Sequence, residues 1–328
     1  MLKVLAISLN TFKEAVRNKV LYFLLIFAIL IIVFSSFISD LSIAAPDRLI
    51  KDLGLASIDF FGFLIAVFVG VYLVYNELDK KTIYTIVSKP IDRYQFILGK
   101  YFGLLITILV NMIIMSLFLF AVLYWRETFA SDKLSNLLYP EIVPGKREAI
   151  ANLQFHYYLF HVKTFFIAIG KAVATLFGYS EAITAGLLRV ISFSALGLSI
   201  ITAFAIFYST FSTPTLSAVF TSLTFVIGSL SEDIVRYAEK LAEKVGGPAA
   251  LTGADVLKYN FATWAVQIVP NLAYFDKRAE AIHGPAAMKV PAILAPTLSD
   301  PWAVAYGLLY TAGILCLASL IFNRRNFK

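Results

Sequence analysis

Three glycine–lysine pairs are the parts of this chain that come closest to a phosphate-binding loop. They begin at Gly99, Gly145 and Gly170, and the next residues are Tyr, Arg and Ala. A loop of the form GxxxxGK[ST] needs Ser or Thr there, because that hydroxyl binds Mg²⁺ while backbone amides hold the phosphates. We therefore expect no ATP site and no Mg²⁺ site in this chain.

Histidine and cysteine offer little further chemistry. The single cysteine, Cys316, lies in an apolar run, so it predicts neither a disulfide framework nor a metal site. His156 and His161 are five residues apart, a poor spacing for one helix face. No histidine, serine and carboxylate share the spacing of a hydrolytic motif. We expect no cofactor, no metal and no enzymatic activity, with an intramembrane enzyme as a minor alternative.

The composition is that of an integral membrane protein. Of 328 residues, 59% are hydrophobic and 15% are charged, and the mean hydropathy is +0.80. Soluble domains of this size carry about 25% charged residues. The net charge of +7 could indicate nucleic acid. The basic residues flank apolar runs, however, which suits a lipid bilayer and anionic headgroups.

Six charge-poor stretches predict six transmembrane helices, since about 20 apolar residues cross the hydrocarbon core. These spans are residues 20–38, 57–75, 99–125, 187–208, 214–230 and 302–322. The fold class is therefore all-α, with one membrane domain over 1–328 and two long connections at 126–183 and 231–301. Within the first connection, the apolar stretch 155–179 carries two histidines and two lysines. It is interpreted as an amphipathic or partly embedded helix and not as a seventh span.

Three further helices are predicted outside the spans. Residues 1–19 alternate apolar and basic side chains, which predicts an amphipathic helix in the membrane interface. Residues 231–245 form a charged helical pattern, with Ser231 as a candidate cap. Residues 261–275 are apolar but short and interrupted by Pro270, which predicts a re-entrant or interfacial segment.

The distribution of Lys and Arg predicts the orientation. The two ends of the chain, residues 76–100 and the turn at 209–213 hold 12 basic residues in 55 positions, against 15 in 147 for the other side. Basic residues concentrate on the cytoplasmic side. We therefore expect both termini and the interval at 76–100 in the cytoplasm.

Ionisable residues are scarce inside the spans. Asp59, Lys100 and Arg189 lie near span ends, and Asn111 is the main polar residue inside the third span. Ion-coupled transporters need titratable groups or broken helices at mid-membrane. Asn111 is interpreted as an interhelical hydrogen-bond partner, with a contact to the transport path as the alternative. Active transport by this chain would need energy from another subunit.

The polar interval NELDKKTIYTIVSKPIDRYQFILGKY, residues 76–101, suits the attachment of such a subunit. A short helix over 82–88 would place Ile83 and Ile86 on one face, bordered by charged residues, and Pro90 would end it. The alternative is a merely solvated loop.

The chain resembles the type 2 ABC-transporter permeases. The likeness is carried by NTFKEAVRNK at 10–19 and most specifically by residues 75–101, with weaker matches of FSTPT, SED, PNL and FNRRNF at 211–215, 231–233, 270–272 and 322–327. In this family the segment between spans two and three is a cytoplasmic coupling helix that docks on an ABC ATPase. The connection at 126–183 is longer than the family core needs.

The resemblance implies a permease subunit in a prokaryotic cell membrane, paired as a homodimer or with a second permease. Transport would be export, with ATP and Mg²⁺ on the partner ATPase. The alternative is a non-transporting scaffold or assembly protein. The substrate stays open among lipid, hydrophobic drug, peptide and glycan. The residues implied in ATPase coupling are Glu77, Lys80, Lys81, Thr82, Ile83, Ile86, Lys89, Pro90, Asp92 and Arg93.

Overall fold

The computed structural model describes residues 2–40, 46–79, 92–130, 185–244, 252–283 and 300–324. The described residues form helices and connecting turns without strands. The helices are α1 (Leu2–Val16), α2 (Lys19–Asp40), α3 (Pro46–Asp79), α5 (Arg93–Ala130), α8 (Ala185–Ser209), α9 (Pro214–Ser229), α10 (Ser231–Glu243), α11 (Ala254–Ile268), the 3₁₀ turn η2 (Leu272–Phe275), α12 (Arg278–His283) and α13 (Asp300–Arg324).

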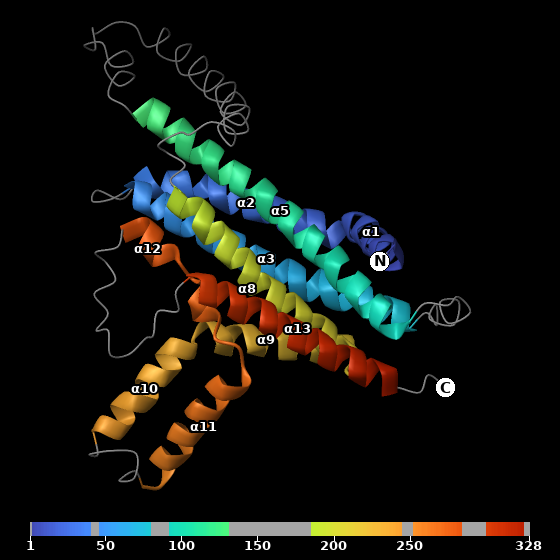
Figure 1. Ribbon diagram of the computed structural model, residues 1–328. Coiled ribbons are helices and arrows are strands. Elements are labelled where there is room, and N and C mark those ends of the chain that lie inside the picture. Colours follow the sequence, from blue (N-terminus) through green and yellow to red (C-terminus); the bar gives the residue numbers. More distant parts are fainter. Residues whose placement is uncertain are drawn as a thin grey trace, which may run out of the picture.

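Five long helices form the body of the protein. Figure 1 shows α2, α3, α5, α8 and α13 running along one another, with both chain termini at the same end. α3 contacts α2, α5 and α8, and α8 also contacts α13. The buried core is continuous through these helices and consists mainly of leucine, isoleucine, valine, alanine and phenylalanine. The all-helical fold predicted from the sequence is confirmed.

In the described part of the chain, five helices are long and apolar enough to cross a membrane, and the pair α9 and α10 makes a sixth crossing if both are counted as one span. α9 has 16 residues, which corresponds to about 24 Å at 1.5 Å per residue. A hydrocarbon core of about 30 Å is thicker than that. The fifth predicted span is therefore shorter than its partners, and the chain bends by 60° where α9 meets α10.

All five long helices extend beyond their predicted spans, and α3 and α5 do so by the most residues. α3 begins at Pro46 and not near residue 57, because proline suits a first helical turn and Ile50 and Leu55 continue its buried face. α5 begins at Arg93 and ends at Ala130, so it includes the first residues of the predicted outer connection. The remainder of that connection, with the predicted helix at 155–179, lies outside the described residues.

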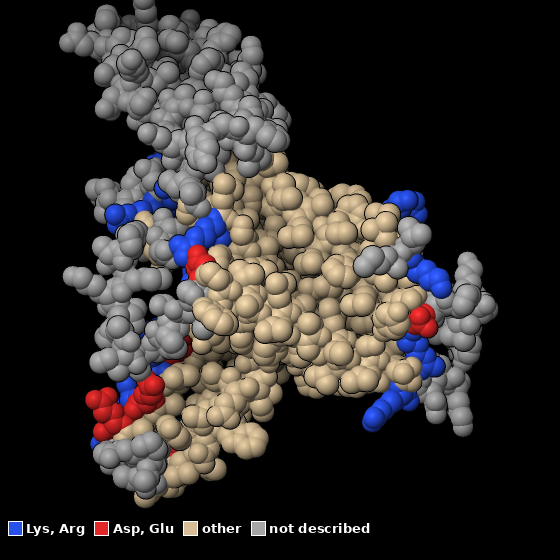
Figure 2. All heavy atoms as spheres, in the orientation of Figure 1, with Lys and Arg blue, Asp and Glu red and all other residues tan. Residues whose placement is uncertain are grey.

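The surface has the banding of a membrane protein. On the face shown in Figure 2, the charged residues gather at the two ends of the bundle, and the broad belt between them carries none. α2 contributes exposed phenylalanines to its outer face, among them Phe23, Phe34 and Phe37. Exposed aromatic and aliphatic side chains along the spans match contact with lipid.

α10 and α11 form a hairpin that projects from the bundle (Figure 1). The predicted helix at 231–245 is present as α10. Ser231 does not cap it: its hydroxyl donates instead to Asn271 Oδ1 at 2.5 Å. The predicted re-entrant stretch 261–275 is the second half of α11, a break at Pro270 and the turn η2.

Candidate functional site: the junction of α1, α5 and α13

The structure describes the two edges of the predicted coupling interval. Glu77 lies in the last turn of α3, and Asp92 and Arg93 stand at the start of α5. The other predicted coupling residues lie outside the described residues: Lys80, Lys81, Thr82, Ile83, Ile86, Lys89 and Pro90. The coupling helix itself therefore stays a prediction, whereas the junction where the interval joins α5 lies within the described residues.

Asp92 starts α5. Its backbone carbonyl accepts from the amides of Gln95 and Phe96, at 3.0 and 3.3 Å. Its carboxylate also accepts from Gln95 Nε2 at 2.9 Å. A negative side chain suits the positive end of the helix dipole. The interval thus leads into a helix with an ordered first turn.

Arg93 fastens this first turn to α13. Its Nη1 donates to the carbonyl oxygens of Phe322 and Asn323, at 3.2 and 2.8 Å. These carbonyls lie in the last turn of α13, where backbone acceptors lack helical partners and a cation is favoured. One turn further along α5, Phe96 stacks on Phe322 with ring centroids 5.8 Å apart. Arg93 was predicted to border an ATPase contact, and its guanidinium is directed at α13.

The next turns of α5 pack against α1 through two glycines. A Cβ atom on Gly99 would lie 2.6 Å from the Cβ of Ile7. A Cβ atom on Gly103 would lie 2.5 Å from the Cβ of Thr11 and 2.7 Å from the carbonyl oxygen of Ser8. Small residues four apart allow helices in membranes to approach this closely. We call this contact the α1–α5 seam.

An ion pair completes the seam. Lys100 lies between the two glycines and is 1% exposed, so it is fully buried. Its Nζ is 3.6 Å from the Glu14 carboxylate of α1 and 5.9 Å from the ring centroid of Phe96. A buried ammonium requires a charged partner or an aromatic face, and this lysine has both. The amino-terminal helix is therefore tied to α5 by shape and by charge.

The junction can transmit a displacement from the polar interval to several helices. The first turns of α5 are held by the end of α13, and the next turns are held by α1. A displacement at residues 76–92 would therefore reach three helices together. The sequence contains a local signal for the seam, since GKYFG at 99–103 is a small-xxx-small motif, although the seam was not among the sequence-based predictions. The contact between Arg93 and α13 has no local sequence signal, because its partners are 229 and 230 residues away.

Asn111 lies buried in the middle of α5. Its Nδ2 donates to the carbonyl oxygen of Thr107 in the same helix, at 2.8 Å. Among the described residues its Oδ1 accepts no hydrogen bond. The described contact is therefore within one helix, and neither the interhelical bond nor the contact to the transport path is tested.

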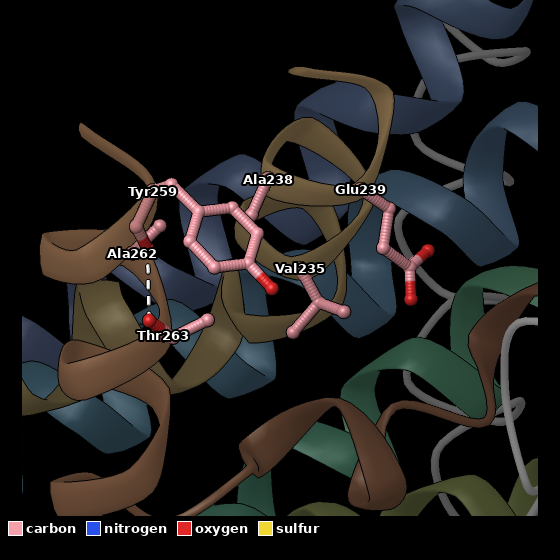
Figure 3. Close-up of a pocket in the computed structure, with 6 residues that line it drawn as sticks. All are labelled: Val235, Ala238, Glu239, Tyr259, Ala262 and Thr263. Atoms are coloured by element: carbon pink, nitrogen blue, oxygen red, sulfur yellow. Dashed lines mark hydrogen bonds between the residues drawn. The ribbon is translucent and has the colours of Figure 1, made fainter. Parts of the chain in front are cut away.

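A cavity of about 120 Å³ lies between α10 and α11. Figure 3 shows its lining by Val235, Ala238, Glu239, Tyr259, Ala262 and Thr263. The Thr263 hydroxyl donates back to the carbonyl oxygen of Tyr259, so it is not aimed at a ligand. The two alanines explain the gap, because small side chains leave space between packed helices. Within the described parts of the chain, no three His, Cys, Asp or Glu residues lie together as metal ligands.

Residues 12–145 match the family described as ABC-2 family transporter protein. No curated protein matches the chain. The matched residues carry the end of α1, then α2, α3, the polar interval and α5. The predicted resemblance to type 2 permeases is confirmed over these residues, and the match supports a permease subunit of an ABC transporter.

Proposed function

We propose that this permease subunit exports its substrate through a path formed with a second permease subunit, and that a separate ABC ATPase drives it through residues 77–93. ATP and Mg²⁺ are bound by the ATPase. The partner permease is a second copy of this chain or a related subunit. The protein is a multi-pass component of a prokaryotic cell membrane.

The junction at the start of α5 supports this function most strongly. An ATPase that closes on ATP can move membrane helices only through a segment that is firmly attached to them. Arg93 attaches the exit of the interval to α13, and the α1–α5 seam attaches it to α1. Its other edge is the continuous helix α3. The interval is therefore joined to four of the long or interfacial helices.

The charge distribution supports a cytoplasmic position for this junction. Both termini and the junction lie at one end of the bundle (Figure 1). On the visible face, that end carries mainly Lys and Arg, whereas the opposite end carries both signs (Figure 2). Basic residues next to spans are retained on the cytoplasmic side. An ATPase in the cytoplasm would reach the interval directly.

The decisive variant changes the apolar face of the interval. We expect Ile83→Asp with Ile86→Asp to abolish co-purification of the ATPase or to uncouple its ATP hydrolysis, while the permease still inserts. Burying two carboxylates at an apolar contact costs several kcal/mol unless they are paired. The matched control is Ile83→Leu with Ile86→Leu, which keeps the face apolar and should retain the ATPase.

The measurements are membrane insertion, ATPase co-purification and the ATP hydrolysis rate of the reconstituted complex. Normal coupling of ATP hydrolysis to transport in the Asp double variant would contradict the proposal that residues 77–93 contact the ATPase. A scaffold function would be favoured if no ABC ATPase co-purified with the unmodified chain. Vesicle transport assays with lipid, drug, peptide and glycan probes would then identify the substrate and the direction.

A further inference from the structure

Helix α1 uses one face for the α1–α5 seam and leaves the rest of its surface open. Ser8, Thr11 and Ala15 are buried, and among the described helices α1 packs chiefly against α5. Leu5 and Leu9 lie outside this face, and their side chains are 59% and 48% exposed. Residues four positions apart are neighbours on a helix surface, so these two leucines form an apolar stripe beside the seam. Such a stripe, next to a membrane span, suits contact with the outer ends of acyl chains.

A third face of α1 is basic. Lys13 and Arg17 are exposed and four residues apart, so they share this face. Lys19, the first residue of α2, is exposed as well. Within the described parts of the chain, none of these three side chains forms an ion pair with a carboxylate. We call Lys13, Arg17 and Lys19 the basic face, and their charges are available to a partner outside the described residues.

The one acidic residue of α1 belongs to the seam. Glu14 is the only Asp or Glu among the first 39 residues of the chain. Its carboxylate lies 3.6 Å from the Nζ of the buried Lys100. The negative charge of Glu14 is therefore balanced by α5 and not by Lys13 or Arg17. As a result, the exposed charge of α1 is entirely positive, although its sequence contains both signs.

The turn between α1 and α2 sets the depth of the basic face. The two helices are separated by only two residues, and the membrane span begins at Lys19. Asn18 orders this turn, since its side-chain oxygen accepts from the Val20 amide at 3.0 Å. Lys13 and Arg17 therefore lie within about two helical turns of the point where the chain enters the bilayer. Figure 1 shows α1 at the end of the bundle that carries both termini.

We propose that the basic face binds the headgroups of anionic phospholipids, while Leu5 and Leu9 lie against the acyl chains of the same leaflet. Basic side chains beside a span attract anionic lipids, and an interfacial helix binds such a surface through its apolar and basic faces together. The apolar stripe favours a lipid surface over the acidic surface of a protein partner, because acyl chains can cover it. Bound lipid holds α1 at the membrane surface, and the seam extends this hold to α5.

An indole on the apolar stripe can report which lipid lies against α1. In a background with Trp125→Phe, Trp264→Phe and Trp302→Phe, Leu9→Trp gives the chain a single indole at an exposed position of α1. The purified full chain is reconstituted in mixtures of phosphatidylglycerol and phosphatidylcholine, with one of the two brominated on its acyl chains. Bromine quenches indole fluorescence on contact, so the quenching gives the relative binding constant of the two lipids at this site.

The decisive variant adds Lys13→Gln with Arg17→Gln to this background. We expect the reporter to prefer phosphatidylglycerol, and the preference to fall at least about five-fold in the variant, the factor that one basic side chain contributes near an anionic surface. The matched control, Lys13→Arg with Arg17→Lys, keeps both charges and should keep the preference. Lys240→Gln with Lys244→Gln removes the same charge at exposed positions of the α10–α11 hairpin and should keep it too. A reporter without preference, or a preference unchanged in the decisive variant, would overturn the proposal.

A second variant adds a charge and removes none. Asn10 is exposed and lies three residues before Lys13, on the same side of α1. Asn10→Glu should weaken the preference for phosphatidylglycerol by about five-fold, because one negative charge opposes the basic face, whereas Asn10→Gln should leave it unchanged. Equal preferences in these two variants would contradict the proposal. Loss of a co-purifying ABC ATPase from Lys13→Gln with Arg17→Gln, at an intact lipid preference, would also overturn it and assign the basic face to the ATPase.

Discussion

Gly103→Ala is the sharpest test of the α1–α5 seam. The added methyl group would lie 2.5 Å from Thr11 Cβ and 2.7 Å from the Ser8 carbonyl oxygen, where non-bonded carbons normally stay at least 3.4 Å apart. The seam must therefore open by about 1 Å, and overpacking of this kind costs about 1–3 kcal/mol. Because the Ser8 oxygen is backbone, a rotamer change of Thr11 alone cannot relieve the clash.

The matched control is Gly313→Ala in α13, where a Cβ atom would meet nothing within 4 Å. Both glycines lie inside helices, so the gain in helix propensity is the same in each variant. Unfolding of the purified proteins in detergent by increasing denaturant gives the difference. We expect Gly103→Ala to unfold at lower denaturant than the unmodified chain, and Gly313→Ala to be unchanged or more stable.

The same two variants should differ in function. Opening the seam moves the start of α5 away from α1, so ATP hydrolysis coupled to this subunit should fall in Gly103→Ala and stay normal in Gly313→Ala. Equal stability and equal coupling in the two variants would refute the reasoning. It would mean that α1 and α5 are not held together as tightly in the membrane as the 2.5 Å distance requires.

Two further predictions concern charged contacts at the two ends of the bundle. Arg93→Gln should lower the free energy of unfolding by about 1 kcal/mol, since one charged donor to the Phe322 and Asn323 carbonyls is lost at a partly exposed site. Arg93→Lys keeps the charge and should therefore lower the free energy of unfolding by less. Unfolding of both variants by denaturant measures the difference. The pKa of Asp276 lies below its usual value because of Arg278, so its contribution is present at neutral pH and is lost as pH falls through the folded-state pKa. The stability difference between the unmodified chain and Asp276→Asn, measured from about pH 6 to about pH 3, should therefore shrink with acidification; a difference that does not change would contradict this.

Much of the bundle follows from the amino-acid sequence. An uninterrupted apolar run such as residues 20–38 predicts a helix that crosses the membrane. Inside the bilayer every backbone polar group must be hydrogen-bonded within the protein, and a helix achieves this within one segment. The helix boundaries were harder to predict from the sequence. Charged residues near the start of α3 interrupt the apolar run but not the helix, so the predicted span began too late. Hydropathy locates the part of a helix that lies in lipid and not the part that extends beyond it.

The functional contacts were only partly predictable. The small-xxx-small motif at Gly99 and Gly103 is local and could have been found. Lys100 has no local sign of burial, because its Glu14 partner lies on another helix. The packing around Phe275 depends on glycines at 197, 228 and 307, which lie 31 and 79 positions apart along the chain and meet only after folding. Long-range juxtaposition of this kind is set by helix packing and has no periodic signature.

The length of α5 has a consequence for the size of the movement that an ATPase would need to make. Its 38 residues correspond to about 57 Å, so it is a lever much longer than the bilayer is thick. If it stays straight, a rotation of about 5° about its anchored start displaces its far end by about 5 Å, given that length. A shift small enough to leave the seam and the α13 contact intact could thus widen the opposite side by the diameter of a small chemical group.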